Sequence, residues 1–209
     1  GSIMRLSLNL FFYVLFLSFL NLSVKAEMTL NNLIFDDAKP YHLKILDALP
    51  LEGKIQFGPD NATHTIIEFF DYFCGYCKKI HPELLELVES RDDVRVVFLQ
   101  HPILNESSKA IAKIAIAAGM QGKGFEFHDY IFTIQGSITN EKLKESIKKA
   151  DINEVKLAID LDRDEVEKIM KLSSFLAGGS GARGTPAIFI NNTFYPGYLP
   201  KAKIEALLN

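Results

Sequence analysis

Cysteine and excess positive charge are both scarce in this sequence. Only two of the 209 residues are cysteine, which excludes a small domain held together by a framework of disulfides. Lys and Arg number 23 against 26 for Asp and Glu, so we expect no nucleic acid among the partners. The 48% of hydrophobic and 23% of charged residues are typical of one globular domain with a full-sized core.

Long apolar runs are also lacking, apart from one near the start of the sequence. Residues 1–26 begin with a tag scar of three residues and contain a 15-residue apolar run from Leu6 to Leu20. This run is shorter than the roughly 17 residues that a membrane-spanning helix needs. Small residues precede Ala26, so the sequence predicts a signal peptide that is cleaved after Ala26 and a protein that is exported. An uncleaved anchor is the alternative, and we expect contact with a membrane only through this segment.

The apolar periodicity of the remaining sequence predicts an α/β fold. Two short, almost wholly apolar runs are typical of buried strands, and the helical pattern between them completes a βαβ unit. A long helical block follows, and then a further strand, a hairpin and a closing helix. The expected strands span residues 65–70, 94–99 and 187–190, and the helical block runs from residue 105 to about residue 178.

These elements divide the sequence into four parts. Residues 1–26 are the tag scar and the signal peptide. Residues 27–62 form an N-terminal arm that is expected to be irregular, because it contains several Pro and Gly residues and no sustained helical period. Residues 63–104 and 184–209 together form one domain, and residues 105–183 form a helical domain inserted into it.

The two cysteines lie close together, in the sequence Phe73-Cys74-Gly75-Tyr76-Cys77, at the expected start of a helix. Unpaired N–H groups and the helix dipole stabilise a thiolate at Cys74 in that position. Cys77, one turn deeper, can then attack a mixed disulfide and release the partner. A purely structural disulfide is the alternative, but closing so short a loop removes little entropy from the unfolded chain.

A metal or haem site is not expected at these cysteines. Two cysteines are too few for a structural zinc site, and covalent haem attachment requires a His where Lys78 stands. We therefore expect no metal and no cofactor.

Three segments carry a family resemblance. They are IIEFFDYFCGYCKKIHPEL, HPILNESSKAIAKIAIAAGMQGKGFEFHD and GTPAIFINN, in this order. Together they resemble the DsbA and ScsC branch of bacterial thiol-disulfide oxidoreductases. The resemblance implies a thioredoxin fold in which a helical domain is inserted between the βαβ half and a cis-proline loop, and a location in the periplasm.

The resemblance also implies a role for each residue that matches the motifs of the family. Cys74 would be the nucleophile and Cys77 the resolving thiol. Glu68 matches a buried acid beneath the cysteines that assists proton transfer to or from the deeper thiol, although it could instead be an edge residue turned to solvent. The residues expected to contact a bound peptide are Thr185, Pro186, Gly75 and Tyr76, with a cis bond before Pro186.

The sequence therefore predicts an exported protein thiol-disulfide oxidoreductase that acts on protein substrates with cysteines. Gly75-Tyr76 between the cysteines and Thr185 before the proline resemble DsbC-type isomerases more than the strongly oxidising DsbA, so we expect isomerase or reductase activity. The resemblance further implies a redox partner in the membrane. A function of another class remains open: an exported protein of the same fold that binds a soft metal such as Cu(I) through both cysteines, or an interaction protein.

Overall fold

The computed structural model describes residues 38–209 and divides the chain into two compact units, Gly1–Ala48 and Leu49–Asn209. The predicted signal peptide, with its cleavage site after Ala26, lies outside the described residues. The described part of the first unit contains one helix, α2 (Tyr41–Ala48). The second unit contains the sheet, both cysteines and the remaining helices.

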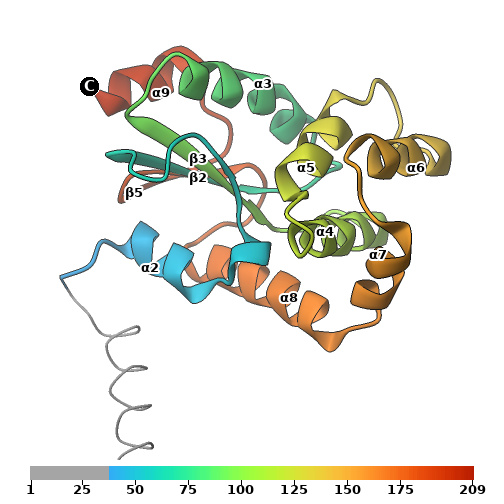
Figure 1. Cartoon of the computed structure of the whole chain (residues 1–209). Coiled ribbons are helices and arrows are strands. Elements are labelled where there is room, and N and C mark those ends of the chain that lie inside the picture. The colour runs from blue at the N-terminus through green and yellow to red at the C-terminus, as the bar shows by residue number, and fades with distance from the viewer. Residues whose placement is uncertain (1–37) are drawn as a thin grey trace, which may run out of the picture. The chain divides into compact units, whose positions relative to one another are not determined.

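A five-stranded mixed sheet forms the centre of the second unit (Figure 1). Its strands are β1 (Ile55–Phe57), β2 (His64–Phe70), β3 (Val94–Gln100), β4 (Ala187–Ile190) and β5 (Thr193–Pro196), in the order β1-β3-β2-β4-β5. β2 and β3 are parallel, with Ile66 opposite Val96, because the chain crosses between them through the helix α3 (Gly75–Glu89). The three other strand pairs are antiparallel.

Helices cover both faces of this sheet. Between β3 and β4 the chain forms α4 (Glu106–Gly119), α5 (Gly124–Thr133), α6 (Asn140–Lys149), α7 (Glu154–Leu161) and α8 (Asp164–Gly179), and it ends in α9 (Lys201–Leu208). Figure 1 shows α3 and α9 over one face of the sheet and α8 under the other, while α4 to α7 gather at one end. The α/β fold with a helical block inserted between the βαβ half and the last strands is thereby confirmed.

The central strand explains why the sequence pattern was informative. Every residue from Thr65 to Phe70 in β2 is buried, so both faces of the strand need apolar or otherwise satisfied side chains. On one face, β2 packs under α3, whose buried side includes Cys77, Ile80 and Leu84. The cysteines are therefore fixed to the best-buried part of the molecule.

The expectation of an irregular arm over residues 27–62 is corrected by the structure. Its described part contains α2, a 3₁₀ turn at Leu51–Gly53 and the edge strand β1, which places Ile55 opposite Phe98 of β3. A strand of three residues is too short to show an alternating pattern. It forms here because the edge of β3 offers backbone partners that are distant in the sequence.

Candidate active site

Cys74 occupies the N-cap of α3, so its sulfur faces the first free N–H groups of the helix. The Sγ atom accepts a hydrogen bond from the N–H of Cys77 at 3.4 Å. A hydrogen bond from the thiol of Cys77, together with the backbone N–H groups, lowers the pKa of Cys74 to about 5 although partial burial opposes the shift. Cys74 is therefore a thiolate near neutral pH, and a thiolate is the nucleophilic form of cysteine.

Cys77 has the opposite character. Its side chain is fully buried, and burial, followed by the hydrogen bond with Cys74 and the charge of Glu68, raises the pKa of its thiol well above the ordinary value. Both cysteines are free thiols in this structure. The geometry thus separates an activated outer sulfur from an inner sulfur that keeps its proton until a base removes it.

Glu68 is buried beneath the cysteines, so its alternative placement as an edge residue turned to solvent does not occur. The side chain is 1% exposed, and Oε1 has no hydrogen-bond partner in the part of the chain that the structure describes. Burial raises the pKa of this carboxyl well above 4.5, while a hydrogen bond with Cys77 opposes the shift. A carboxyl with a raised pKa beside a protonated thiol can accept and return the proton of that thiol.

The loop before β4 lies directly against the outer sulfur. The peptide bond between Thr185 and Pro186 is cis, as predicted, and the carbonyl oxygen of Thr185 lies 3.2 Å from Sγ of Cys74. The carbonyl oxygen of Pro186 is already taken, because it accepts a hydrogen bond from the N–H of Gly197 at 2.9 Å. The structure therefore brings Cys74 and the Thr185-Pro186 loop together, 111 residues apart in the sequence.

Gly75 and Tyr76, between the cysteines, are both exposed. The ring of Tyr76 lies 5.7 Å from the ring of Tyr198, and the hydroxyl of Tyr198 donates to Glu83 of α3 at 2.7 Å. Lys79 lies over the same Tyr198 ring at 4.5 Å. Nothing in the sequence pattern singled out Tyr198, because the contact joins the start of α3 to the loop before α9 only in three dimensions.

A small cavity of about 220 Å³ opens beside Cys74. One wall comes from the segment Tyr72–Lys78 and the other from the end of α5 and the loop after it, with Ile131, Phe132, Ile134 and Ile138 as apolar lining residues. Lys78 also lines this cavity, and its amino group donates to the carbonyl of Ile134. The inserted helical block therefore forms one side of the entrance to the outer thiol.

Asp71 is a further residue of the site that sequence reasoning missed. Its carboxylate is completely buried, three residues before Cys74, and accepts four hydrogen bonds. Its backbone carbonyl accepts another from the N–H of Cys74 at 3.0 Å. An acid that directly follows an apolar strand, three residues before the first cysteine, was a usable signal, because buried carboxylates are almost always paired with donors.

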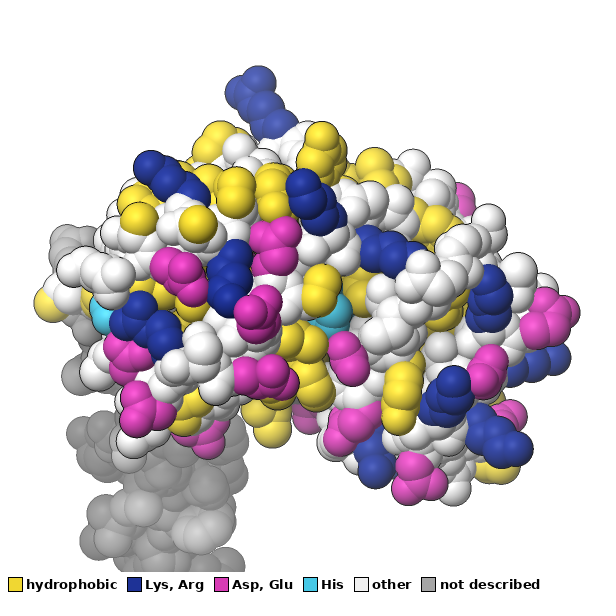
Figure 2. All heavy atoms as spheres, turned by 90° about the horizontal axis from the view of Figure 1, so that it is seen from above, with side chains coloured by type: hydrophobic (Ala, Val, Ile, Leu, Met, Phe, Trp, Pro, Cys, Tyr) yellow, Lys and Arg dark blue, Asp and Glu magenta, His cyan; other side chains and the backbone are white. Residues whose placement is uncertain are grey.

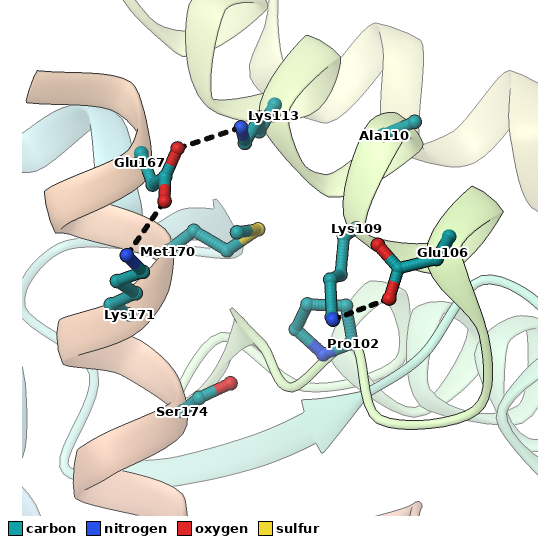
Figure 3. Close-up of a pocket in the computed structure, with 9 residues that line it drawn as sticks. All are labelled: Pro102, Glu106, Lys109, Ala110, Lys113, Glu167, Met170, Lys171 and Ser174. Atoms are coloured by element: carbon teal, nitrogen blue, oxygen red, sulfur yellow. Dashed lines mark hydrogen bonds and ion pairs between the residues drawn. The ribbon is translucent and has the colours of Figure 1, made fainter. Parts of the chain in front are cut away.

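A second cavity, of about 540 Å³, lies between α4 and α8 (Figure 3). Neither cysteine lines it. Its five charged side chains are paired with one another, through Glu106 with Lys109 and through Glu167 with both Lys113 and Lys171. Because these charges are already satisfied, the candidate active site is the thiol pair and not this cavity.

The described residues contain no group of three His, Cys, Asp or Glu side chains placed to hold a metal ion. Figure 2 shows the face formed by α3 and α9, where Lys and Arg side chains alternate with Asp and Glu and with exposed hydrophobic groups. No continuous patch of one charge sign covers this face.

A family model described as thioredoxin matches residues 51–209. The chain belongs to the thioredoxin family. The match begins at the 3₁₀ turn before β1 and includes both cysteines, the helical block and the Thr185-Pro186 loop. The predicted thioredoxin fold is thereby confirmed.

Curated relatives in this family include proteins with much longer chains. The sequence is 28% identical over 161 residues to the Na(+)/H(+) antiporter NhaA 1 of Salinispora arenicola, covering 72% of this chain and 23% of the antiporter. It is 27% identical over 161 residues to a probable thiol:disulfide interchange protein DsbC of Bordetella avium, covering 77% of this chain and 47% of that protein. The chain thus spans about a quarter to a half of the length of these relatives. Within residues 38–209, no helix is long and apolar enough to cross a membrane.

Solved structures of the family superpose over most of their length. A thioredoxin-like oxidoreductase from Silicibacter pomeroyi is 28% identical with a TM-score of 0.70, covering 78% of this chain and 94% of that one. A periplasmic thioredoxin-like protein from Salmonella enterica serovar Typhimurium is 27% identical with a TM-score of 0.69, covering 78% and 93%. The fold is shared with the catalytic domain of Proteus mirabilis ScsC. That domain is 23% identical with a TM-score of 0.70, covering 80% of this chain and 94% of that one. The predicted resemblance to thioredoxin-like oxidoreductases is confirmed by the 28% identical Silicibacter protein.

Proposed function

We propose that this chain is an exported protein thiol-disulfide oxidoreductase, and that Cys74 and Cys77 exchange disulfides with cysteine-containing protein substrates. One observation carries the proposal: a thiol whose pKa is lowered to about 5 lies at the start of α3, 3.2 Å from the carbonyl of Thr185. The thiolate is available for attack, and the half-exposed Thr185 lies beside it, where a substrate chain bound to Cys74 would pass.

The proposed reaction needs no group beyond the substrate and this chain. The thiolate of Cys74 attacks one sulfur of a substrate disulfide, the substrate S–S bond breaks, and its other sulfur leaves as a thiolate. Cys77 then gives its proton to Glu68 and attacks Sγ of Cys74, which expels the remaining substrate sulfur. The substrate gains two electrons and the cysteine pair loses two as it forms a disulfide. The reverse sequence oxidises a dithiol substrate.

We propose that the chain acts in the periplasm and that a redox partner in the membrane restores its cysteine pair. Support for export comes from the apolar run and small residues before Ala26, and from the similar Salmonella protein, which is described as periplasmic. A cysteine pair that has been oxidised by one substrate must be reduced before it can reduce another, so turnover as a reductase requires a reductant, and the membrane partner is proposed for that role.

The proposed direction is isomerisation or reduction. DsbA, a strong oxidant, has a cysteine pKa of about 3.5, and thioredoxin, a reductant, has one of about 7. The value of about 5 at Cys74 lies between them. Together with Gly75-Tyr76 and Thr185, which resemble DsbC-type isomerases, this value favours a pair that is less oxidising than DsbA.

Two standard assays test this function. The reduced protein should accelerate reduction of insulin and should refold scrambled ribonuclease, while a Cys74→Ser variant should do neither. Inactivity of the wild type in both assays, together with tight Cu(I) binding by both cysteines, would favour the metal-binding alternative.

We predict that Thr185→Val shifts the reduction potential of the pair by about 30 mV away from oxidase behaviour, since one hydrogen bond is worth about 1 kcal/mol. After the hydrogen bond from Cys77, a hydrogen bond with the Thr185 side chain also lowers the pKa of Cys74, so it stabilises the reduced, thiolate form of the pair, and its loss destabilises that form. Equilibration with glutathione buffers measures the shift. Thr193→Val, on the exposed strand β5, is the matched control. An unchanged potential with unchanged ribonuclease refolding would show that Thr185 does not set the direction.

A further inference from the structure

A short segment between β5 and α9 connects the cis-proline loop to α3. It begins at Gly197 and ends at Lys201, the first residue of α9, and is called the brace. The N–H of Gly197 donates to the carbonyl of Pro186 at 2.9 Å, so the brace is tied to the loop that contacts Cys74. Gly197 has a φ of +98°, which glycine adopts without strain, and this lets the chain turn from β5 toward α3.

Glu83 fastens the other end of the brace to α3. Its Oε1 atom accepts a hydrogen bond from the hydroxyl of Tyr198 at 2.7 Å, and its Oε2 atom accepts one from the backbone N–H of Lys201 at 3.0 Å. This N–H belongs to the first turn of α9, so it has no partner within its own helix. Because a carboxylate is an acceptor only, its two oxygens suit these two donors. The brace is thus joined to the helix that carries Cys74 at its N-cap.

The ring of Tyr198 makes two further contacts with the start of α3. It lies 5.7 Å from the ring of Tyr76, and the amino group of Lys79 lies 4.5 Å from its centroid. These contacts need the aromatic ring but not the hydroxyl. Tyr198→Phe therefore removes the hydrogen bond to Glu83 and keeps both ring contacts.

The position of the cis-proline loop matters for the outer thiol. After the hydrogen bond from Cys77, a hydrogen bond with Thr185 helps to lower the pKa of Cys74. Thr185 precedes β4, whereas Cys74 belongs to α3, so the contact depends on how the loop and the helix are held together. Strand pairing fixes β4 to β2, but α3 packs on the sheet through apolar side chains, whose attraction is not directional. The brace adds directional hydrogen bonds between the loop and the helix.

We propose that Glu83 and Tyr198 are positioning residues that hold the cis-proline loop against Cys74 and thereby set the redox equilibrium of the cysteine pair. They act through Thr185. When the brace is weakened, Thr185 stabilises the thiolate less, and the disulfide form of the pair gains relative to the dithiol form. The inference rests on the proposed function and deepens it, because it identifies residues that regulate the exchanging pair.

Tyr198→Phe and Glu83→Gln test the proposal in glutathione buffers. There the cysteine pair gives two electrons and two protons to glutathione disulfide, which becomes two glutathione thiols. We expect each variant to shift the equilibrium constant about threefold toward the protein disulfide, less than the roughly tenfold shift expected for Thr185→Val, because the brace acts on Thr185 indirectly. The pH midpoint of Cys74 alkylation should rise by about half a unit, the same threefold change.

Each variant has a matched control. Glu86→Gln removes the same charge from the next turn of α3, where Glu86 pairs with the amino group of Lys201 at 2.8 Å but not with its backbone. Tyr195→Phe removes a hydroxyl from a half-exposed tyrosine of β5, three residues before Tyr198. Both controls are expected to leave the equilibrium constant unchanged.

A double variant tests whether the brace acts through Thr185. Glu83→Gln combined with Thr185→Val should have the equilibrium constant of Thr185→Val alone, because the contact that the brace supports is then already lost. Additive shifts would overturn the proposal. Single variants with a lower free energy of unfolding but an unchanged equilibrium constant would overturn it too, since Glu83 and Tyr198 would then be merely structural.

These measurements use no protein substrate, so they separate the brace from the proposed function. Unchanged equilibrium constants in both single variants would overturn the role of the brace, while activity of the wild type toward insulin and scrambled ribonuclease would keep the proposed function. Inactivity of the wild type in those assays would overturn the proposed function and leave the shift in glutathione buffers to decide the role of the brace.

Discussion

Cys74→Ser is expected to abolish thiol-disulfide exchange, whereas Cys77→Ser is expected to accumulate mixed disulfides with protein substrates. Only Cys74 has a lowered pKa, and only its sulfur reaches the Thr185 carbonyl, so only it can attack. Without Cys77, the mixed disulfide at Cys74 has no neighbouring thiol to resolve it. Non-reducing electrophoresis followed by mass spectrometry would show these complexes in Cys77→Ser.

The double variant, with serine at both positions, is the control and should form no mixed disulfides with protein substrates. The assigned roles predict in addition that Cys74 is the faster of the two thiols in alkylation at neutral pH. Faster alkylation of Cys77, or mixed disulfides that form through Cys77 in a Cys74→Ser protein, would contradict the roles.

Glu68→Gln is expected to slow the resolution of the mixed disulfide by about 10²-fold near neutral pH. This is the loss of rate that is typical when a general base is removed. Gln keeps the shape of Glu but cannot take the proton of the buried Cys77, whose pKa is raised. The first attack by Cys74 does not need this proton transfer and should change little. Stopped-flow measurement of a fluorescent peptide disulfide separates the two steps.

The rate deficit of Glu68→Gln should shrink as the pH rises, because hydroxide can then remove the proton of Cys77. A deficit that is equal in both steps, or independent of pH, would mean that Glu68 does not transfer the proton.

The same substitution has a signature in stability. Burial raises the pKa of Glu68 in the folded protein above 4.5, so the folded state holds this proton more tightly than the unfolded state. The wild type is therefore expected to lose free energy of unfolding, relative to Glu68→Gln, as the pH rises from 4.5 through the raised pKa. Denaturant unfolding at several pH values would measure the difference.

The reactive half of the site could be predicted from the sequence because its signals are local. CGYC after a buried apolar run predicts a thiol at a helix N-terminus, and that position alone explains much of the chemistry of Cys74. The role of Glu68 came from the family resemblance, because the local pattern also allowed an edge residue turned to solvent. The placement of Thr185 and Pro186 beside the thiol came from the family resemblance, not from any local pattern.

The supporting half of the site depends on contacts between distant segments. Asp71 directly follows the apolar run that contains Glu68, but its donors at Ile103, Leu104 and Ser108 belong to a loop and a helix more than 30 residues later. β1 is a comparable case, because three residues form a strand only where the edge of β3 is free. Such features follow from tertiary packing, which overrides local propensity.

The most direct test of the account is the titration of Cys74 in the reduced protein, followed by the ultraviolet absorbance of the thiolate and by the alkylation rate, with Cys74→Ser as the blank. The account predicts a midpoint at a pH of about 5, because hydrogen bonds from Cys77 stabilise the thiolate. The rate should therefore be nearly constant from pH 6 to 8, roughly one unit or more above that midpoint. A midpoint near the ordinary cysteine value of about 8.5 would contradict the central claim that the start of α3 activates this sulfur for disulfide exchange.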